Sequence, residues 1–284
     1  MTDRDSRAGN AEATVQILAK TDIGLVRKRN EDFFVLLPER HLIVLCDGMG
    51  GHPGGDLASR MTAEEVQRSV TAGGSEKPAG NIDQFPALLP FLGMIRGVFS
   101  ADQQLRAYGR RNAQYQGMGT TIVAIQEHAG SVCAIHVGDS RIYCLHQGRL
   151  TQITEDHSVV ATLPESARAS FAGMRNILTR AIGVGEDLEV DFTILPASAG
   201  DVYLLCSDGL HNFVSEERIV EVLRSNRDRA ECLQTLVDDA NRGGGGDNIT
   251  LAIAWIEGNA PQPGARLSGA VWGDGTSLNV QLQK

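Results

Sequence analysis

The sequence lacks a hydrophobic run long enough to cross a membrane. The longest apolar candidate, Phe85–Phe99, is interrupted by two prolines, two glycines and an arginine, whereas a membrane-spanning helix needs about 20 consecutive apolar residues. Residues 1–13 are polar and charged and contain no apolar stretch of the kind found in secretory signals. These absences predict a soluble protein that has no membrane partner.

Paired cysteines and an excess of positive charge are also missing. The five cysteines are scattered and include no C-x-x-C spacing, so we expect buried, reduced thiols in a cytoplasmic protein. The formal net charge is -9, whereas nucleic-acid-binding proteins collect lysine and arginine on one face. We therefore expect no nucleic-acid partner.

Two motifs that handle phosphate are absent as well. No cysteine is followed six residues later by arginine, which excludes the loop of the cysteine-dependent phosphatases. The P-loop pattern G-x-x-x-x-G-K-[ST] does not occur. The glycine run Gly243–Gly246 is better explained as a sharp bend before Asp247 than as a phosphate-binding loop.

Short strand-like runs dominate the rest of the chain. Many are rich in Val, Ile and Leu, as strands buried on a sheet face should be. The predicted strands are Thr14–Ala19, Phe33–Leu37, Leu42–Cys46, Thr120–Glu127, Val132–Val137, Ile142–His146, Asp191–Leu195, Val202–Cys206 and Ile249–Ile256. The pair Gln147-Gly148 predicts a tight hairpin turn, because glycine readily adopts a positive φ.

Helical stretches are fewer and are grouped together. We expect helices over Gly55–Val70 and Leu88–Tyr108, the second with a kink near Gly97, and two more after Ser215 and Asp228. The regular β-α-β alternation of a doubly wound parallel sheet is missing. The pattern therefore predicts an α+β protein in which helices cover antiparallel sheets.

Acidic residues stand at the ends of several predicted strands. Three of them end an apolar run, and three others stand just before a strand. These residues are Asp47, Asp139 and Asp208, followed by Glu31, Asp32 and Asp247. A single Asp-Gly at such a place is commonly only a turn, but several along one chain favour a shared functional site.

Carboxylates that converge must be neutralised by protons or by a divalent cation. Oxygen ligands, with no His or Cys at ligand spacing, select magnesium or manganese rather than zinc. Two such ions bridged by a water form a hydrolytic centre, because they lower the pKa of that water and screen the charge of a phosphate. The acidic residues therefore predict a metal-dependent hydrolase.

Eight short motifs occur in one order along the chain. They are Gly24–Asp32, Asp47–His52, Met118–Thr121, Val137–Arg141, Thr154–Ser158, Asn176–Gly183, Ser207–Leu210 and Gly246–Thr250. Each motif is weak alone, but the ordered set is specific. With these motifs in this order, the chain resembles the metal-dependent protein phosphatases, that is, the type 2C serine/threonine phosphatases, in their bacterial form.

The resemblance implies a four-layer αββα sandwich, in which helices flank two packed antiparallel sheets. It also implies two Mn or Mg ions. Asp47 would bridge both ions, and Gly48 would offer its backbone carbonyl to one of them. Asp208 and Asp247 would complete the shell of the first ion, and Glu31 that of the second.

Further residues take supporting roles in the same resemblance. Asp32 would lie behind the metal ligands, and Asp139 would belong to a third metal site. Arg27 would clamp the phosphate, because a guanidinium can donate to two phosphate oxygens at once. Met49 stands where many members have a histidine thought to protonate the leaving alcohol. His52 is one candidate for that proton and a metal-bound water is another, while a loop-packing role is the alternative for His52.

The resemblance covers nearly the whole chain except its ends. We therefore expect a flexible N-terminus at residues 1–13 and a phosphatase catalytic domain at residues 14–257. Residues 258–284 are predicted to form a tail outside the core, with one extra strand near Leu278–Leu282.

One segment, Val159–Arg175, corresponds to the mobile flap that lies beside the active site in the family. Loops near a site commonly set substrate preference. We expect Asn176 and Arg180 to support this flap. His136, in the middle of a predicted strand, is expected to be a packed core residue rather than a metal ligand.

The predicted function is hydrolysis of phosphoserine and phosphothreonine in proteins, opposing a bacterial Ser/Thr kinase in the cytoplasm. We expect phosphorylated proteins as partners and a monomeric enzyme. The alternatives are a phosphatase of a small phosphoester and a catalytically silent regulatory relative. A silent relative should have lost metal-binding acids, so the presence of Asp47, Asp208 and Asp247 weighs against it.

Overall fold

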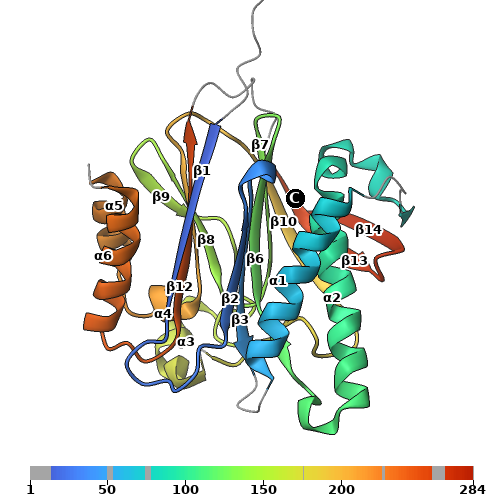
Figure 1. The fold of residues 1–284 in the computed structure, drawn as a ribbon, viewed down its shortest axis with the longest axis horizontal. Coiled ribbons are helices and arrows are strands. Elements are labelled where there is room, and N and C mark those ends of the chain that lie inside the picture. Colours follow the sequence, from blue (N-terminus) through green and yellow to red (C-terminus); the bar gives the residue numbers. More distant parts are fainter. Residues whose placement is uncertain are drawn as a thin grey trace, which may run out of the picture.

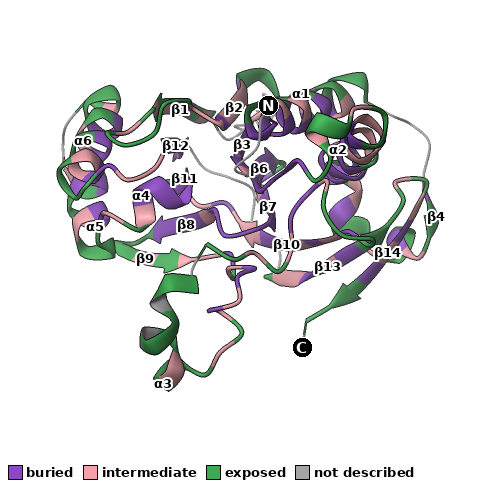
Figure 2. Cartoon of the chain, turned by 90° about the horizontal axis from the view of Figure 1, so that it is seen from below, coloured by how far each residue is buried: buried purple, intermediate pink, exposed green. Residues whose placement is uncertain are grey.

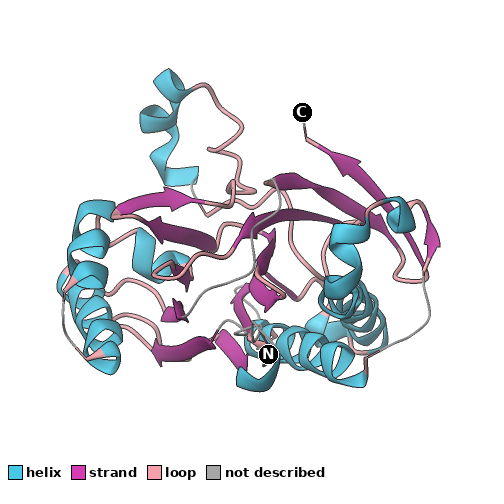
Figure 3. Cartoon of the chain, turned by 90° about the horizontal axis from the view of Figure 1, so that it is seen from above, coloured by secondary structure: helices cyan, strands magenta, loops and turns pink. Residues whose placement is uncertain are grey.

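Two β-sheets pack face to face between helices, as Figures 1 and 3 show. The structure, a computed structural model, describes residues 14–49, 54–73, 78–174, 176–225, 228–257 and 266–283. The smaller sheet has the strand order β1-β12-β11-β8-β9, and the larger has the order β2-β3-β6-β7-β10-β13-β14-β4. Among the described strands, only β14 and β4 pair in parallel. The predicted α+β sandwich is thereby confirmed.

Every strand predicted from the sequence is present. The smaller sheet contains β1 (Thr14–Asp22), β8 (Arg141–His146), β9 (Arg149–Gln152), β11 (Val202–Cys206) and β12 (Ile249–Glu257). The larger sheet contains β2 (Asp32–Leu37), β3 (Leu42–Met49), β4 (Ala79–Gly80), β6 (Ile122–His128), β7 (Ser131–Val137), β10 (Glu189–Pro196), β13 (Leu267–Gly273) and β14 (Ser277–Leu282), and β5 (Gly119–Thr120) pairs with the end of β3. The predicted turn between β8 and β9 is confirmed, because Gln147 and Gly148 have φ of 49° and 83°.

Helices cover the two outer faces. α1 (Gly55–Ala72) and α2 (Leu92–Arg111) pack on the larger sheet, and α5 (Glu216–Arg224) and α6 (Arg229–Arg242) pack on the smaller one. Short helices are α3 (Glu165–Arg168) and α4 (Asp208–His211), and 3-10 turns cover Pro38–Arg40, Ile82–Gln84, Pro86–Phe91, Ala113–Tyr115 and Ala169–Met174. No described helix is both long and apolar enough to cross a membrane.

The buried apolar side chains form three layers, and Figure 2 shows buried residues in purple on strands of both sheets and on the helices that cover them. One layer lies between α1, α2 and the larger sheet, one between the two sheets, and one between the smaller sheet and α5 and α6. Ser215 and Asp228 cap α5 and α6, since their side chains accept from the backbone N–H groups of Arg218 and Ala230. The rigid layers hold the strand ends in fixed positions.

The kink predicted near Gly97 does not occur, because α2 continues through this residue to Arg111. Gly97 instead allows α1 and α2 to approach each other closely. A Cβ atom at Gly97 would lie 2.6 Å from the Cα of Val66 in α1. The prediction was wrong because a glycine in a helical pattern can mark a close helix contact as well as a break.

Gly97→Ala is expected to lower the free energy of unfolding by about 1–3 kcal/mol, because the added methyl group forces two packed backbones apart. Gly109→Ala in the same helix is the matched control. Its Cβ would meet a backbone oxygen of Tyr115 at 3.1 Å, a contact that a small shift relieves. Urea denaturation measures both variants, and equal costs at the two positions would contradict this role of Gly97.

The segment after Gly258 differs most from the sequence prediction. β13 and β14 form a hairpin that extends the larger sheet beyond β10. Val271 and Leu278 are fully buried and belong to the core beneath α1 and α2. The expected tail outside the core is therefore wrong, and the segment contributes two strands rather than one. Residues 1–13 lie outside the described residues.

Candidate metal centre

Strand ends from both sheets meet at one end of the sandwich and surround a cavity of about 160 Å³. From the larger sheet come the start of β2, the end of β3 and the loop after β7. From the smaller sheet come the end of β11 and the start of β12. The predicted site residues that line this cavity are Arg27, Glu31, Asp47, Gly48, Asp139, Asp208 and Asp247.

Asp32 is the predicted site residue that lies behind the cavity rather than in its wall. It faces Asp47 directly across the β2–β3 pair. Its side chain is buried, and one carboxylate oxygen accepts a 2.9 Å hydrogen bond from the hydroxyl of Ser207. Asp32 therefore joins the larger sheet to the end of β11. His52 lies outside the described residues.

The end of β3 is held rigidly around Asp47. The carbonyl of Asp47 accepts hydrogen bonds from the Thr121 N–H at 2.9 Å and from the Thr120 hydroxyl at 2.8 Å. The next residue, Gly48, has no room for a side chain, because a Cβ there would lie 2.1 Å from the carbonyl oxygen of Gly55. The sequence places glycine here because the start of α1 presses on the strand.

The glycine run before Asp247 makes the predicted bend. Gly244 and Gly245 have φ of 138° and 54°, values that disfavour other residues. The bend delivers Asp247 to the cavity, where its carboxylate accepts a 2.7 Å hydrogen bond from Arg27. The side chain of Arg27 is half exposed, so it stands at the mouth of the cavity.

Asn248 is a structural residue of the site that the sequence reasoning did not single out. Its side-chain oxygen accepts from the Glu31 N–H at 2.9 Å. Its amide group donates to the carbonyls of Ile23 and Arg29, both at 2.9 Å. Asn248 therefore fixes the loop that carries Arg27 and Glu31. The only signal was its place in the Gly246–Thr250 motif.

Burial of the clustered carboxylates, together with their mutual repulsion, raises their pKa values. Burial, reinforced by Asp139 and Asp247, raises the pKa of Asp208 to about 8. Burial also raises the pKa of Asp32 to about 7, and it raises that of Asp139 to about 6, with Asp156 as the next cause. The pKa of Asp47 lies well above its usual value, because the side chain is buried and Asp32 and Asp208 are close. One guanidinium at the cavity mouth does not offset this repulsion.

The residues present fit a divalent cation. The donors that line the cavity are carboxylate and carbonyl oxygens, which suit magnesium and manganese. A cation would favour the ionised carboxylates, whose pKa values are raised by burial first and by mutual repulsion second. The cavity therefore offers suitable oxygen ligands for a metal ion, and its carboxylates would be stabilised in their ionised form by the positive charge of that ion.

His136 is buried, as predicted, and it stacks on His157 with 4.5 Å between ring centroids. His136, His157 and Asp191 hold possible ligand atoms within 4.8 Å of one another. The guanidinium of Arg180 already pairs with Asp191 at 2.8 Å and lies 3.3 Å from His157. His157 in turn accepts a hydrogen bond from the N–H of Gly138, so this cluster holds the loop before Asp139.

The flap segment comprises α3 and the 3-10 turn Ala169–Met174. Asn176 and Leu178, which follow this segment in the sequence, contribute to the wall of the cavity. Arg180 ties the base of the segment to β10 through Asp191, in agreement with a supporting role. Asn176 lines the cavity itself.

Residues 27–238 match the model of a family described as protein phosphatase 2C. The chain belongs to the protein phosphatase 2C family. This phosphatase 2C chain is 35% identical over 268 residues to the serine/threonine protein phosphatase PstP of Mycobacterium tuberculosis, covering 92% of the chain. It spans about half the length of that relative, 49%.

Two further comparisons extend over nearly the whole length of the relative. The phosphatase 2C chain is 34% identical over 253 residues to the serine/threonine phosphatase stp of Listeria welshimeri, which covers 86% of the chain and 96% of the relative. A crystal structure of the PstP catalytic domain in complex with two manganese ions matches with a TM-score of 0.71 and 35% identity, over 87% of this chain and all of the other.

Proposed function

We propose that this chain is a protein serine/threonine phosphatase that uses manganese or magnesium to hydrolyse phosphoserine and phosphothreonine. The observation that carries the proposal is the meeting of acidic side chains from both sheets in one cavity beside Arg27. Two relatives named as serine/threonine phosphatases, and the two manganese ions in the PstP catalytic domain, support it.

In this proposal the cavity holds the ions through residues of both sheets. Asp47 would contribute to holding both ions, Gly48 would offer its carbonyl, Asp208 and Asp247 would hold one ion, and Glu31 would contribute to holding the other. Metal bound there supplies a water of lowered pKa and screens the charge of the phosphate. The protein provides the rigid frame, since Thr120, Thr121 and Asn248 fix the backbone of these ligands.

The remaining site residues act on the substrate and on the frame. Arg27 binds and orients the phosphate, because its donors already lie at the cavity mouth and match two phosphate oxygens. Asp139 would serve a third metal ion, and Asp32 holds the end of β11 through Ser207. The proton for the leaving alcohol comes from His52 or from water.

We place the enzyme in the cytoplasm, as a monomer opposing a Ser/Thr kinase. All five cysteines are unpaired and buried, which suits a reducing compartment. Relatives with serine/threonine phosphatase names come from bacteria, which supports a role in bacterial signalling.

Phosphothreonine peptides test the proposed function. Manganese is expected to support their hydrolysis, EDTA to abolish it, and added manganese to restore it, because the proposed hydrolysis needs a water whose pKa the bound ions lower. A cysteine-directed inhibitor should have no effect, since the described cysteines are buried and none of them lines the cavity. Hydrolysis of p-nitrophenyl phosphate without any hydrolysis of peptides would instead favour a small phosphoester as substrate. Failure with both substrates would favour a silent relative.

A further inference from the structure

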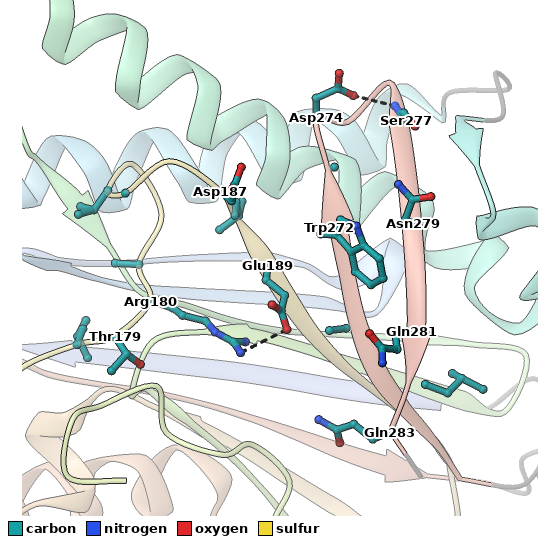
Figure 4. Close-up of a pocket in the computed structure, with 18 of the residues that line it drawn as sticks. Thr179, Arg180, Asp187, Glu189, Trp272, Asp274, Ser277, Asn279, Gln281 and Gln283 are labelled. Carbon is teal, nitrogen blue, oxygen red and sulfur yellow. Dashed lines mark hydrogen bonds and ion pairs between the residues drawn. The ribbon is translucent and has the colours of Figure 1, made fainter. Parts of the chain in front are cut away.

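On the side of the larger sheet that faces the smaller one, the part formed by β10, β13 and β14 is left open by the rest of the described protein. β13 and β14 extend this sheet past the smaller one, and no residue of either strand belongs to the apolar layer between the sheets. Figure 2 shows the two strands projecting beyond the rest of the sandwich. A cavity of about 1180 Å³ lies on this open face (Figure 4).

The open face presents side chains in regular rows. Glu189 on β10, Trp272 on β13 and Asn279 on β14 lie side by side in the strand register. Their chain neighbours Val271 and Leu278 point into the core, so the row faces outward. Figure 4 shows Trp272, Asn279 and Gln281 along this surface.

The cavity on the open face, which is called the groove below, is continuous with the candidate metal centre. Met49 and Leu178 line both the groove and the cavity that holds the clustered carboxylates. A polypeptide with its phosphorylated residue in that cavity therefore has a path onto the open face. β13 and β14 lie beyond residues 27–238, which match the family model, so one wall of the groove is built on a part of the chain that this match does not include, while the other wall, with Arg180, Asp187 and Glu189, lies inside it.

The charges along the groove favour a basic occupant. Its charged lining residues are Asp187, Glu189, Asp274 and Arg180. Arg180 is engaged by Glu189 at 3.3 Å and by Asp191 at 2.8 Å, so acidic groups are in excess.

The uncharged residues that line the groove also suit a basic polypeptide. Trp272 is 39% exposed, and an indole face attracts Lys and Arg side chains. The amide side chains of Asn279 and Gln281 can both donate to and accept from an extended backbone.

We propose that this groove binds an extended, basic segment of the substrate protein that adjoins the phosphorylated residue. The proposal rests on the proposed function as a protein phosphatase, and it adds the sequence preference of that enzyme. The acidic lining attracts the basic side chains, Trp272 packs against them, and the polar rows of β13 and β14 contact the backbone.

The first test uses the wild-type protein with manganese and three phosphothreonine peptides of equal length, with basic, neutral or acidic flanks. We expect kcat/KM to be about tenfold higher for the basic peptide than for the neutral one, mainly through KM, and the ratio to fall with added salt. Equal values for the three peptides would overturn the groove proposal and leave the proposed function intact. Activity on p-nitrophenyl phosphate with none on any peptide would overturn the proposed function itself.

The second test separates the groove from the acidic catalytic cavity. In Asp187→Asn/Glu189→Gln and in Trp272→Ala, the preference for the basic peptide should drop to about twofold or less, with unchanged hydrolysis of p-nitrophenyl phosphate. The matched control is Glu39→Gln/Glu64→Gln, which removes two exposed acids elsewhere and should keep the preference. A preference that survives in both groove variants would overturn the proposal. The proposal would also be overturned if light scattering showed that the wild-type protein is a dimer and that Trp272→Ala dissociates it.

Discussion

Asp208→Ala and Asp247→Ala are each expected to lower kcat/KM for p-nitrophenyl phosphate by roughly a thousandfold or more while the fold survives. In the proposed function both residues hold the same metal ion. Loss of that ion removes several kcal/mol of charge stabilisation from the transition state, and each 1.36 kcal/mol is a factor of ten in rate. Steady-state kinetics at saturating manganese measures the effect.

The fold of Asp208→Ala should survive for a physical reason. The pKa of Asp208 is raised to about 8 by burial and by Asp139 and Asp247, so its ionised carboxylate is costly in the metal-free protein. Removing it is expected to leave the melting temperature in EDTA unchanged or higher. Asp238→Ala, at an exposed position on α6, is the control and should retain full activity. Substantial activity in both cavity variants would contradict the metal centre.

Manganese is expected to raise the melting temperature of the wild-type protein by about 5–10 °C at one hundred times its dissociation constant. Ligand binding at that ratio stabilises the native state by about 2.7 kcal/mol, and proteins of comparable size shift by about 2–4 °C per kcal/mol. Thermal denaturation with and without the ion measures the shift. The absence of any shift at millimolar manganese would argue against the site, and Asp208→Ala should show a smaller shift than wild type.

The size of the manganese shift should grow with pH. In the metal-free fold the pKa of Asp208 is raised to about 8, whereas an unfolded aspartate has a pKa of about 4. Between these values the folded state holds a proton that the unfolded state has released. The proton on Asp208 therefore stabilises the metal-free fold fully below about pH 4, and this stabilisation is lost as the pH rises through about 8. Manganese replaces the protons, so its stabilisation should be greater at pH 8 than at pH 6. An equal shift at both values would contradict this linkage.

The strands and the clustered acids could be predicted because each depends on local sequence. A run such as Leu42–Cys46 has to be buried, and Asp47 at its end is then fixed by the strand that precedes it. The hairpin of β13 and β14 was harder to find, because its outward side chains, such as Asn279 and Gln281, are polar and weaken the apolar signal. Only Leu278–Leu282 was predicted there.

Contacts between distant segments account for the other differences. Gly97 has the same local sequence whether it breaks a helix or packs against Val66, so only the position of α1 decides its role. Asn248 bonds to Ile23 and Arg29, more than 200 residues away, and no local pattern records such bonds. The open groove on β13 and β14 likewise depends on where the smaller sheet ends.

The pairing of β1 with β12, from Thr14 opposite Glu257 to Asp22 opposite Ile249, has a consequence for synthesis on the ribosome. The first described strand, β1, pairs with a strand that is synthesised more than 200 residues later. The smaller sheet can therefore be completed only when nearly the whole chain has emerged. Until then β11 presents an open edge, which is prone to pair with other chains, and Asp247 is not in place. A nascent or prematurely terminated chain therefore cannot assemble the cavity, and the proposed activity requires the completed fold.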